Sequence, residues 1–394
     1  MRILLLAALA LWPLAAWAQL PNPLKIGVLN DQSGPFADQS GKGSVVAAEL
    51  AVEDFRKEAP GIAVEILYGD HQNKPDIGSA IVRAWLDRDG VVAVADAVNS
   101  AVGLAVNDIL RDRHRTFIAT NVGTSALTGK ACAPTTVQWS FDTWALGNSA
   151  ARALVAKGPF FFIGFDYALG QALEADTTAA LKSLGGTVAG SVKHPLGTTD
   201  FSAYLLQAQN SGAKVVAFAS TGTDFINAMK QAAEFGLGRT QVLNGLFTQI
   251  VDVDALGLQA AQGLTLTESF YWDLNEATRA FTQRFAAKMP GRVPTENQAG
   301  VYSSVLAYLR AARASGTIEG EKVVAEMRRA PIQDALFGPV TVRPDGRAIH
   351  PMYVFRVKSP AESKSRWDVY SLLTTIPADQ AFRPLREGGC PLVP

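Results

Sequence analysis

A short polar stretch at the end of an apolar run holds the residues best suited to binding a ligand. Residues 117–128 read F-I-A-T-N-V-G-T-S-A-L-T, so a strand-like segment breaks into small polar residues around Gly123. Such a run exposes backbone N–H groups and hydroxyls at the carboxyl end of a strand, where open α/β sheets bind ligands. The stretch therefore predicts half of a ligand clamp. A plain turn without a ligand uses the same residue types and remains the alternative.

Motifs for catalysis are not recognisable in the sequence. Residues 41–44, G-K-G-S, resemble a phosphate-binding loop, but Phe36 stands where its first glycine should be and Gly43 where Ser or Thr is required. The sequence contains neither a G-x-G-x-x-G nor a G-x-S-x-G motif. We therefore expect a protein that is not an enzyme and needs no cofactor.

The first eighteen residues predict a cleaved signal peptide, so the protein is expected to be exported. Arg2 precedes an apolar run over 3–14, and Ala16-Trp17-Ala18 offers the small residues that a signal peptidase needs. The mature chain would begin near Gln19. The apolar run is shorter than the roughly 20 residues of a membrane-spanning helix, which disfavours an anchored helix.

The chain has two cysteines, Cys132 and Cys390. In an oxidising compartment such a pair is best interpreted as one disulfide, here tying the C-terminal tail to the segment just after the clamp. No metal site is expected, because C-x-x-C is absent and the four histidines are widely scattered. They are His71, His114, His194 and His350.

Length and composition favour two neutral domains. The 394 residues are 48% hydrophobic, enough for a large core and about two domains of ordinary size. Lysine plus arginine equals aspartate plus glutamate, at 36 each. Without a basic field, nucleic acid is not an expected partner.

Strands and helices alternate along the chain in two similar series. In the first series, apolar runs with strand character alternate with runs of helical spacing. They lie at 25–29, 44–55, 64–68, from Pro75, 91–95 and 101–111. The second series follows Trp144, with strands at 160–164, 187–192, 215–220 and 242–243. We therefore expect an α/β protein of two doubly wound parallel-sheet lobes that share a cleft.

The pattern changes after Leu264. Three helices are expected at 278–288, 297–314 and 321–329. A strand pair, 337–342 with 352–357, is expected around the turn Pro344-Asp345-Gly346.

Several short motifs follow one another in a characteristic order. They are S-G-P at 33–35, Gly43 before the first helix, Asp70 after the second strand, Ser100-x3-Leu104-Ala105, Gly236-Leu237 and Q-A-G-V-Y at 298–302. In this order they resemble the type I periplasmic solute-binding proteins, most closely those similar to the leucine/isoleucine/valine-binding proteins of ABC importers. The resemblance covers nearly the whole mature chain.

The resemblance implies two lobes that close on a small solute, which a permease in the inner membrane then receives. Lobe 1 would comprise 24–143 and 274–340, and lobe 2 would comprise 144–273 and 341–394. The hinge would have three segments, near 141–144, 271–273 and 337–340. The protein would be a periplasmic monomer.

The carboxylate-binding residues of the family map onto Ser100 and onto the opening stretch. The serine after the third strand falls on Ser100, and the small-residue loop falls on Asn121, Val122, Gly123 and Thr124. In the family these groups hold the ligand carboxylate through hydroxyls and backbone N–H groups, assisted by the positive end of the following helix. An N-cap that serves only its own helix is the alternative role for Ser100.

The second lobe departs from the family pattern. The motif D-x-x-Y-G reads D-Y-A-L-G at 166–170, so Leu169 replaces the aromatic residue and Tyr167 would substitute for it. The acid that meets an α-amino group should follow Gly245, where the sequence is L-F-T. An unpaired ammonium in a closed cleft costs several kcal/mol, more than the roughly 0.5–2 kcal/mol that ring contact returns.

We therefore expect capture of a small carboxylate, with an apolar or aromatic acid preferred over a free α-amino acid. The second lobe would contribute Trp144, Tyr167, Thr221 and Phe247. A branched-chain amino acid remains the alternative if Asp142, Asp224 or Glu268 supplies the missing charge. A sensor or regulator with the same fold and a hydrolase are the other classes considered.

Overall fold

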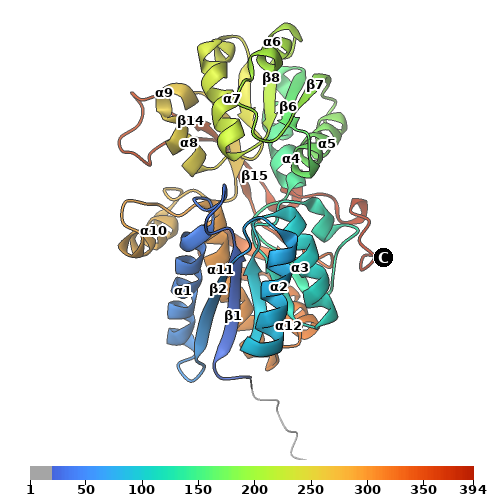
Figure 1. Ribbon diagram of the computed structural model, residues 1–394, viewed down its shortest axis with the longest axis vertical. Helices are drawn as coiled ribbons and strands as arrows, with labels where there is room; N and C mark the ends of the chain where they lie inside the picture. The colour runs from blue at the N-terminus through green and yellow to red at the C-terminus, as the bar shows by residue number, and fades with distance from the viewer. Residues whose placement is uncertain (1–19) are drawn as a thin grey trace, which may run out of the picture.

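The computed structural model describes residues 20–394. The expected signal peptide at 1–18 lies outside the described residues. Two lobes are stacked along the long axis of the molecule, each with a central sheet and surrounding helices (Figure 1). The predicted α/β fold of two lobes is thereby confirmed. Among the described helices, none has the length and apolar character that crossing a membrane requires.

The first lobe contains a sheet of five parallel strands in the order β2-β1-β3-β4-β5. The strands are β1 (Leu24–Asn30), β2 (Val64–Asp70), β3 (Val91–Asp96), β4 (Thr116–Ala119) and β5 (Thr136–Gln138). The helices are α1 (Gly41–Glu58), α2 (Pro75–Ala84), α3 (Ser100–Asp112), α10 (Glu276–Lys288), α11 (Glu296–Ser315) and α12 (Gly320–Arg328). Strands β3 and β4 are buried along their whole length, as parallel strands covered on both faces are.

The second lobe contains a seven-stranded sheet in the order β15-β14-β10-β9-β8-β6-β7. Five strands run parallel: β6 (Phe160–Phe165), β7 (Val188–His194), β8 (Val215–Ala219), β9 (Val242–Gly245) and β10 (Thr265–Glu268). Strands β14 (Met352–Val357) and β15 (Tyr370–Ile376) add an antiparallel edge. The helices are α4 (Thr143–Leu154), α5 (Ala168–Ser183), α6 (Ser202–Asn210), α7 (Gly222–Glu234), α8 (Ile250–Leu256) and α9 (Leu258–Ala261).

The predicted pairing of 337–342 with 352–357 is wrong. Strand β12 (Gly338–Val342) instead pairs with the short β13 (Ala348–Ile349) and with β11 (Ile332–Asp334). Strand β14 pairs with β10 and β15 of the second lobe. Pro351, which has no backbone N–H, separates β13 from β14 and lets the chain change sheets there.

The third crossing between the lobes follows from this pairing. Val340, Val342 and Ala348 pack in the same core as α1 and α11 of the first lobe. The chain therefore leaves the first lobe at His350 and Pro351. We propose this position for the third lobe boundary, in place of the boundary at residue 340.

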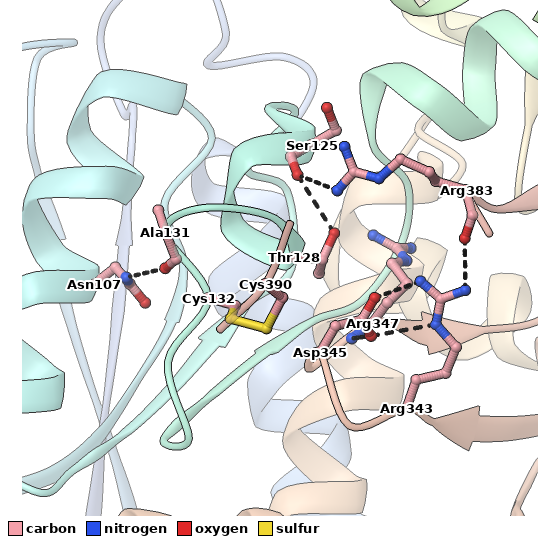
Figure 2. The surroundings of a disulfide bond; sticks show 10 residues. All are labelled: Asn107, Ser125, Thr128, Ala131, Cys132, Arg343, Asp345, Arg347, Arg383 and Cys390. Atoms are coloured by element: carbon pink, nitrogen blue, oxygen red, sulfur yellow. Dashed lines mark hydrogen bonds and ion pairs between the residues drawn. A yellow bond between two sulfur atoms is a disulfide. The ribbon is translucent and has the colours of Figure 1, made fainter. Parts of the chain in front are cut away.

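The C-terminal tail returns to the first lobe. Beyond α13 (Ala378–Ala381), the guanidinium of Arg383 donates to the carbonyl oxygen of Ser125 at 3.0 Å. The predicted disulfide between Cys132 and Cys390 is confirmed, with the two Cα atoms 5.7 Å apart (Figure 2). Because β15 belongs to the second lobe, the tail makes a fourth connection between the lobes.

Candidate functional site

A cavity of about 150 Å³ lies between the lobes. The first lobe contributes residues from the loops at the carboxyl ends of its parallel strands, and the second contributes the start of α5 and the loop after β9. The lining residues are Phe36, Asn73, Val98, Asn99, Ser100, Ala101, Gly123, Tyr167, Ala168, Leu169 and Phe247. Four of the expected ligand-binding residues are therefore brought together: Ser100, Gly123, Tyr167 and Phe247.

The hydroxyl of Ser100 is positioned to donate a hydrogen bond into the cavity. The helix cap is Asn99, whose Oδ1 accepts from the N–H groups of Ala101 at 2.9 Å and Val102 at 3.2 Å. Ser100 is therefore not the N-cap of α3. Its Oγ accepts from the N–H of Thr124 at 3.2 Å. A hydroxyl that accepts one bond keeps its own proton, so Ser100 can still donate to an acid group.

Gly123 brings its backbone to the cavity wall. The carbonyl oxygen of Gly123 accepts from the N–H of Thr143 at 2.8 Å, while its own N–H meets no acceptor within the described residues. A Cβ at this position would lie 3.7 Å from Cδ1 of Leu169 and 3.8 Å from Oγ of Ser100. A side chain here would therefore occupy the space that a ligand needs.

The other expected first-lobe residues support the loop from behind. Asn121 is buried, and its Nδ2 donates to Oδ1 of Asp96 at 2.5 Å. Val122 is buried in the core of the first lobe. Oγ1 of Thr124 accepts from the N–H of Ala126 at 3.2 Å and so caps the 3₁₀ turn Ser125–Thr128. Direct contact between these side chains and a ligand remains a prediction.

Two expected second-lobe residues lie outside the cavity lining. Thr221 is buried, and its Oγ1 accepts from Nε2 of Gln39 in the first lobe at 3.3 Å. Trp144 lies half-buried in the first turn of α4. Their ligand contacts likewise remain predictions.

The second-lobe wall of the cavity is apolar and aromatic. The ring centroid of Tyr167 lies 5.2 Å from that of Phe165, and the ring centroid of Phe247 lies 5.0 Å from that of Phe141. Burial, assisted by the charge of Asp224, raises the pKa of Tyr167, so its phenol stays neutral. Within residues 20–394, the cavity lining therefore contains no ionised side chain.

The three acids considered as partners for an α-amino group are bonded elsewhere. Oδ1 of Asp142 accepts from the N–H of Ala145 at 2.7 Å and caps α4. Oδ2 of Asp224 accepts from the N–H of Gly197 at 2.9 Å. Oε1 of Glu268 accepts from the hydroxyl of Tyr370 at 2.8 Å. None of the three lines the cavity.

Phe36 and Asn73 are lining residues that the sequence analysis missed. The carboxylate of Asp31 organises their loops, because it accepts from the N–H of Phe36 at 3.0 Å and from Nδ2 of Asn73 at 2.7 Å. Both residues follow strands whose carboxyl ends meet at the same edge as β3 and β4. That shared edge was a usable signal, since ligands of parallel sheets bind there.

A family comparison agrees with this architecture. Residues 23–364 match the model of the family described as periplasmic binding protein. The chain belongs to this family. The predicted resemblance to the proteins similar to the Leu/Ile/Val-binding proteins is also confirmed by the relatives. Periplasmic binding proteins of ABC transporters bind their substrates without converting them. As a member of this family, the chain is a binding protein and not an enzyme.

Three relatives illustrate the range of similarity. The Leu/Ile/Val-binding protein homolog 6 of Brucella melitensis is 29% identical over 359 residues, which cover 89% of this chain and 91% of the relative. A branched chain amino acid ABC transporter periplasmic ligand-binding protein of Burkholderia xenovorans is 40% identical, with a TM-score of 0.88 and coverage of 94% and 99%. An R. palustris solute-binding protein in complex with 4-hydroxybenzoate is 20% identical, with a TM-score of 0.81 and coverage of 91% and 98%. This last likeness shows the fold alone.

Proposed function

We propose that this protein captures a small carboxylic acid with an apolar body, aromatic or branched, and delivers it to an ABC permease in the inner membrane. The observation that carries the proposal is the uncharged lining of the cavity between the lobes, which has polar donors on the first-lobe side. The ligand carboxylate would accept from Oγ of Ser100 and from the N–H of Gly123. Its apolar body would face Tyr167, Leu169 and Phe247.

The size of the cavity supports a ligand with one ring or a short branched chain. An apolar cavity of about 150 Å³ in another protein takes up benzene, and the cavity here has the same volume, about 150 Å³. An enclosed aromatic side chain buries roughly 150–250 Å², and a ligand with one aromatic ring would bury a similar area in this cavity. The complex of the distant R. palustris protein with 4-hydroxybenzoate is consistent with such a ligand, although the likeness itself extends only to the fold.

A branched-chain amino acid is the second candidate. It is favoured by the description of the 40% identical B. xenovorans protein. Against it stands the absence of an acidic residue from the cavity lining, which would leave the ammonium group of the ligand without a counter-charge.

The two candidates differ most clearly for a pair of ligands that share one carbon skeleton. 4-Methylpentanoate is leucine without its amino group, so the pair isolates the contribution of the ammonium. A thermal-shift panel would compare this pair and, alongside it, benzoate and 4-hydroxybenzoate with isoleucine and valine. We expect the simple acids to raise the melting temperature more, because they have no ammonium group that the cavity would leave without a counter-charge. The tighter ligand gives the larger rise at equal concentration, since a ligand stabilises the native state in proportion to ln(1 + [L]/Kd). Stabilisation by the amino acids alone would instead establish the second candidate.

A further inference from the structure

A second group of contacts joins the lobes near the ligand cavity. Nε2 of Gln39 in the first lobe donates to Thr221 Oγ1 and Asp252 Oδ2 of the second lobe, each at 3.3 Å. Nε2 of Gln249 in the second lobe donates to Glu296 Oε1 at 3.3 Å and Asn297 Oδ1 at 2.7 Å in the first. We call this group the interlobe seam. It consists of Gln39, Thr221, Gln249, Asp252, Glu296 and Asn297, together with Glu268, whose buried carboxyl lies close enough to Glu296 and Asp252 to feel their charge.

Three acids of the interlobe seam are buried, and only neutral groups donate hydrogen bonds to them. Asp252 lies on α8, Glu268 at the end of β10 and Glu296 at the start of α11, with exposed fractions of 4%, 1% and 0%. Glu296 Oε2 accepts from the N–H and Oγ of Ser269 at 2.8 and 2.9 Å. Glu268 accepts from the hydroxyl of Tyr370, and Asp252 also accepts from the N–H of Gln249 at 2.9 Å.

The charged groups around these acids are themselves acidic. Glu268 faces both Glu296 and Asp252, and Asp38 of the loop before α1 adds its negative charge near Asp252. The nearby cation Arg292 is paired with Asp38, at 3.0 Å, and not with any of the three acids. Within the described part of the chain, none of the three acids forms an ion pair with a lysine, arginine or histidine.

Separating the lobes would change the surroundings of these acids. Burial raises the pKa of Asp252 to about 7 and that of Glu296 to about 7, and it raises the pKa of Glu268 well above its usual range. If the lobes separated along these contacts, Asp252 would lose Gln39 and Glu296 would lose Gln249, and both carboxyls would gain access to water. Their pKa values would then fall toward the ordinary values of about 4.

We propose that the interlobe seam couples closing of the lobes to proton uptake, so that the protein holds its ligand more tightly in a mildly acidic medium than in a neutral one. The proposal rests on the proposed function to the extent that the ligand binds by closing the lobes. The closed state has the raised pKa values, so the stabilisation of closure is complete below about pH 4. It is lost as the pH rises to about 7.

Calorimetric titration of benzoate and of leucine tests the coupling in the presence of a ligand. We expect the Kd of the ligand that binds to be at least about threefold lower at pH 5.5 than at pH 7.5. Titrations in two buffers of different ionisation enthalpy should show net proton uptake. The double substitution Asp252→Asn and Glu296→Gln should reduce both effects, because the amides keep an acceptor oxygen but do not titrate.

Asp254→Asn is the matched control for the double substitution. Asp254 lies on the same helix as Asp252, but its carboxylate pairs with Arg366 at 2.6 Å near the surface. This variant should keep the wild-type pH dependence. A pH-independent Kd without proton uptake in the wild type would overturn the proposal, and so would an unchanged pH dependence in the double variant.

Small-angle scattering without a ligand separates this proposal from the proposed function. We expect a smaller radius of gyration at pH 5.5 than at pH 7.5, and a smaller difference in the double variant. If neither benzoate nor leucine binds, the proposed ligands are wrong while the scattering still tests the seam. An equal radius of gyration at both pH values would overturn the proton-coupled closing.

Discussion

At the scale of single residues, the candidate site depends on where one hydroxyl proton points. The N–H of Thr124 occupies one acceptor position of Ser100 Oγ, and Asn99 relieves Ser100 of capping α3. The hydroxyl is therefore both fixed and available. In the proposed complex it would donate to a carboxylate, and hydrogen bonds to charged groups contribute roughly 1.5–3 kcal/mol.

Ser100→Ala should accordingly weaken binding of the best acid from the panel by about tenfold or more. The fold should lose little stability, because Asn99 remains as the cap. Calorimetric titration at pH 5.5 would give the affinity, and thermal unfolding would give the stability. Ser202→Ala is the matched control, since Ser202 is the exposed first residue of α6. Equal affinities of the two variants would mean that the acid group binds elsewhere.

Part of this site was predictable from the sequence, and the rest depended on side-chain direction. Residue type and its place after a strand predict Gly123, and the family resemblance predicts Ser100. Asn121 lies in the same loop, yet its side chain turns inward to Asp96. Residue type does not reveal which side chains of an irregular loop face the cleft. Phe36 was missed because an isolated aromatic residue after a strand also suits a core position.

At the scale of elements, a buried arginine joins the segments that cross between the lobes. Arg347 has no exposed surface, and its guanidinium donates to the carbonyl oxygens of Trp139 at 2.6 Å and Phe141 at 2.9 Å. It also lies 4.3 Å from the ring centroid of Phe382 in the tail. Burial lowers the pKa of Arg347 to about 10, so it remains charged at neutral pH. One side chain thereby holds the first crossing, the β12–β13 hairpin and the tail together.

Arg347→Met should destabilise the protein by about 3–5 kcal/mol, because it leaves buried carbonyl groups without their donor and the Asp142 carboxylate, 3.7 Å from the guanidinium, without its ion-pair partner. Urea unfolding would measure the change in the free energy of unfolding. Arg366→Met provides the comparison, since the Arg366 side chain is 61% exposed and should be almost neutral to remove. A loss below about 1 kcal/mol in Arg347→Met would show that the hinge does not need this residue.

The order of the elements was largely predictable, but one strand partner was not. The strand and helix periods correctly indicated the alternating units of both lobes. The hairpin partner of β12 was missed because β13 has two residues, too few to display an alternating pattern. Without β13, the next apolar run, which is β14, was assigned as the partner. The true partners of β14 are β10, which is distant in sequence, and β15, which has a weak alternating pattern.

At the scale of the whole molecule, the described part of the chain connects the two lobes four times. Three segments cross between them, and the tail adds a covalent link through the disulfide of Cys132 and Cys390. The loop that this bond closes contains most of both lobes, because the two cysteines are 258 residues apart. The bond therefore restricts the unfolded chain strongly.

Replacing both cysteines by serine should lower the free energy of unfolding by about 2–5 kcal/mol. Thermal and urea unfolding under non-reducing conditions would measure the loss. Dithiothreitol should shift the wild type toward the variant and leave the variant itself unchanged. If the wild type and the variant unfold at the same temperature, the tail is held by its noncovalent contacts alone.

The long separation of the two cysteines also bears on how the protein reaches its native state. With two cysteines in the sequence, oxidation within one molecule has a single outcome, so no wrongly paired monomer needs to be reshuffled. The bond can form only after both sheets have been synthesised, since Cys390 follows every strand of both lobes. Oxidation is thus a late step in maturation, and it leaves no wrong pairing within the molecule for an isomerase to correct.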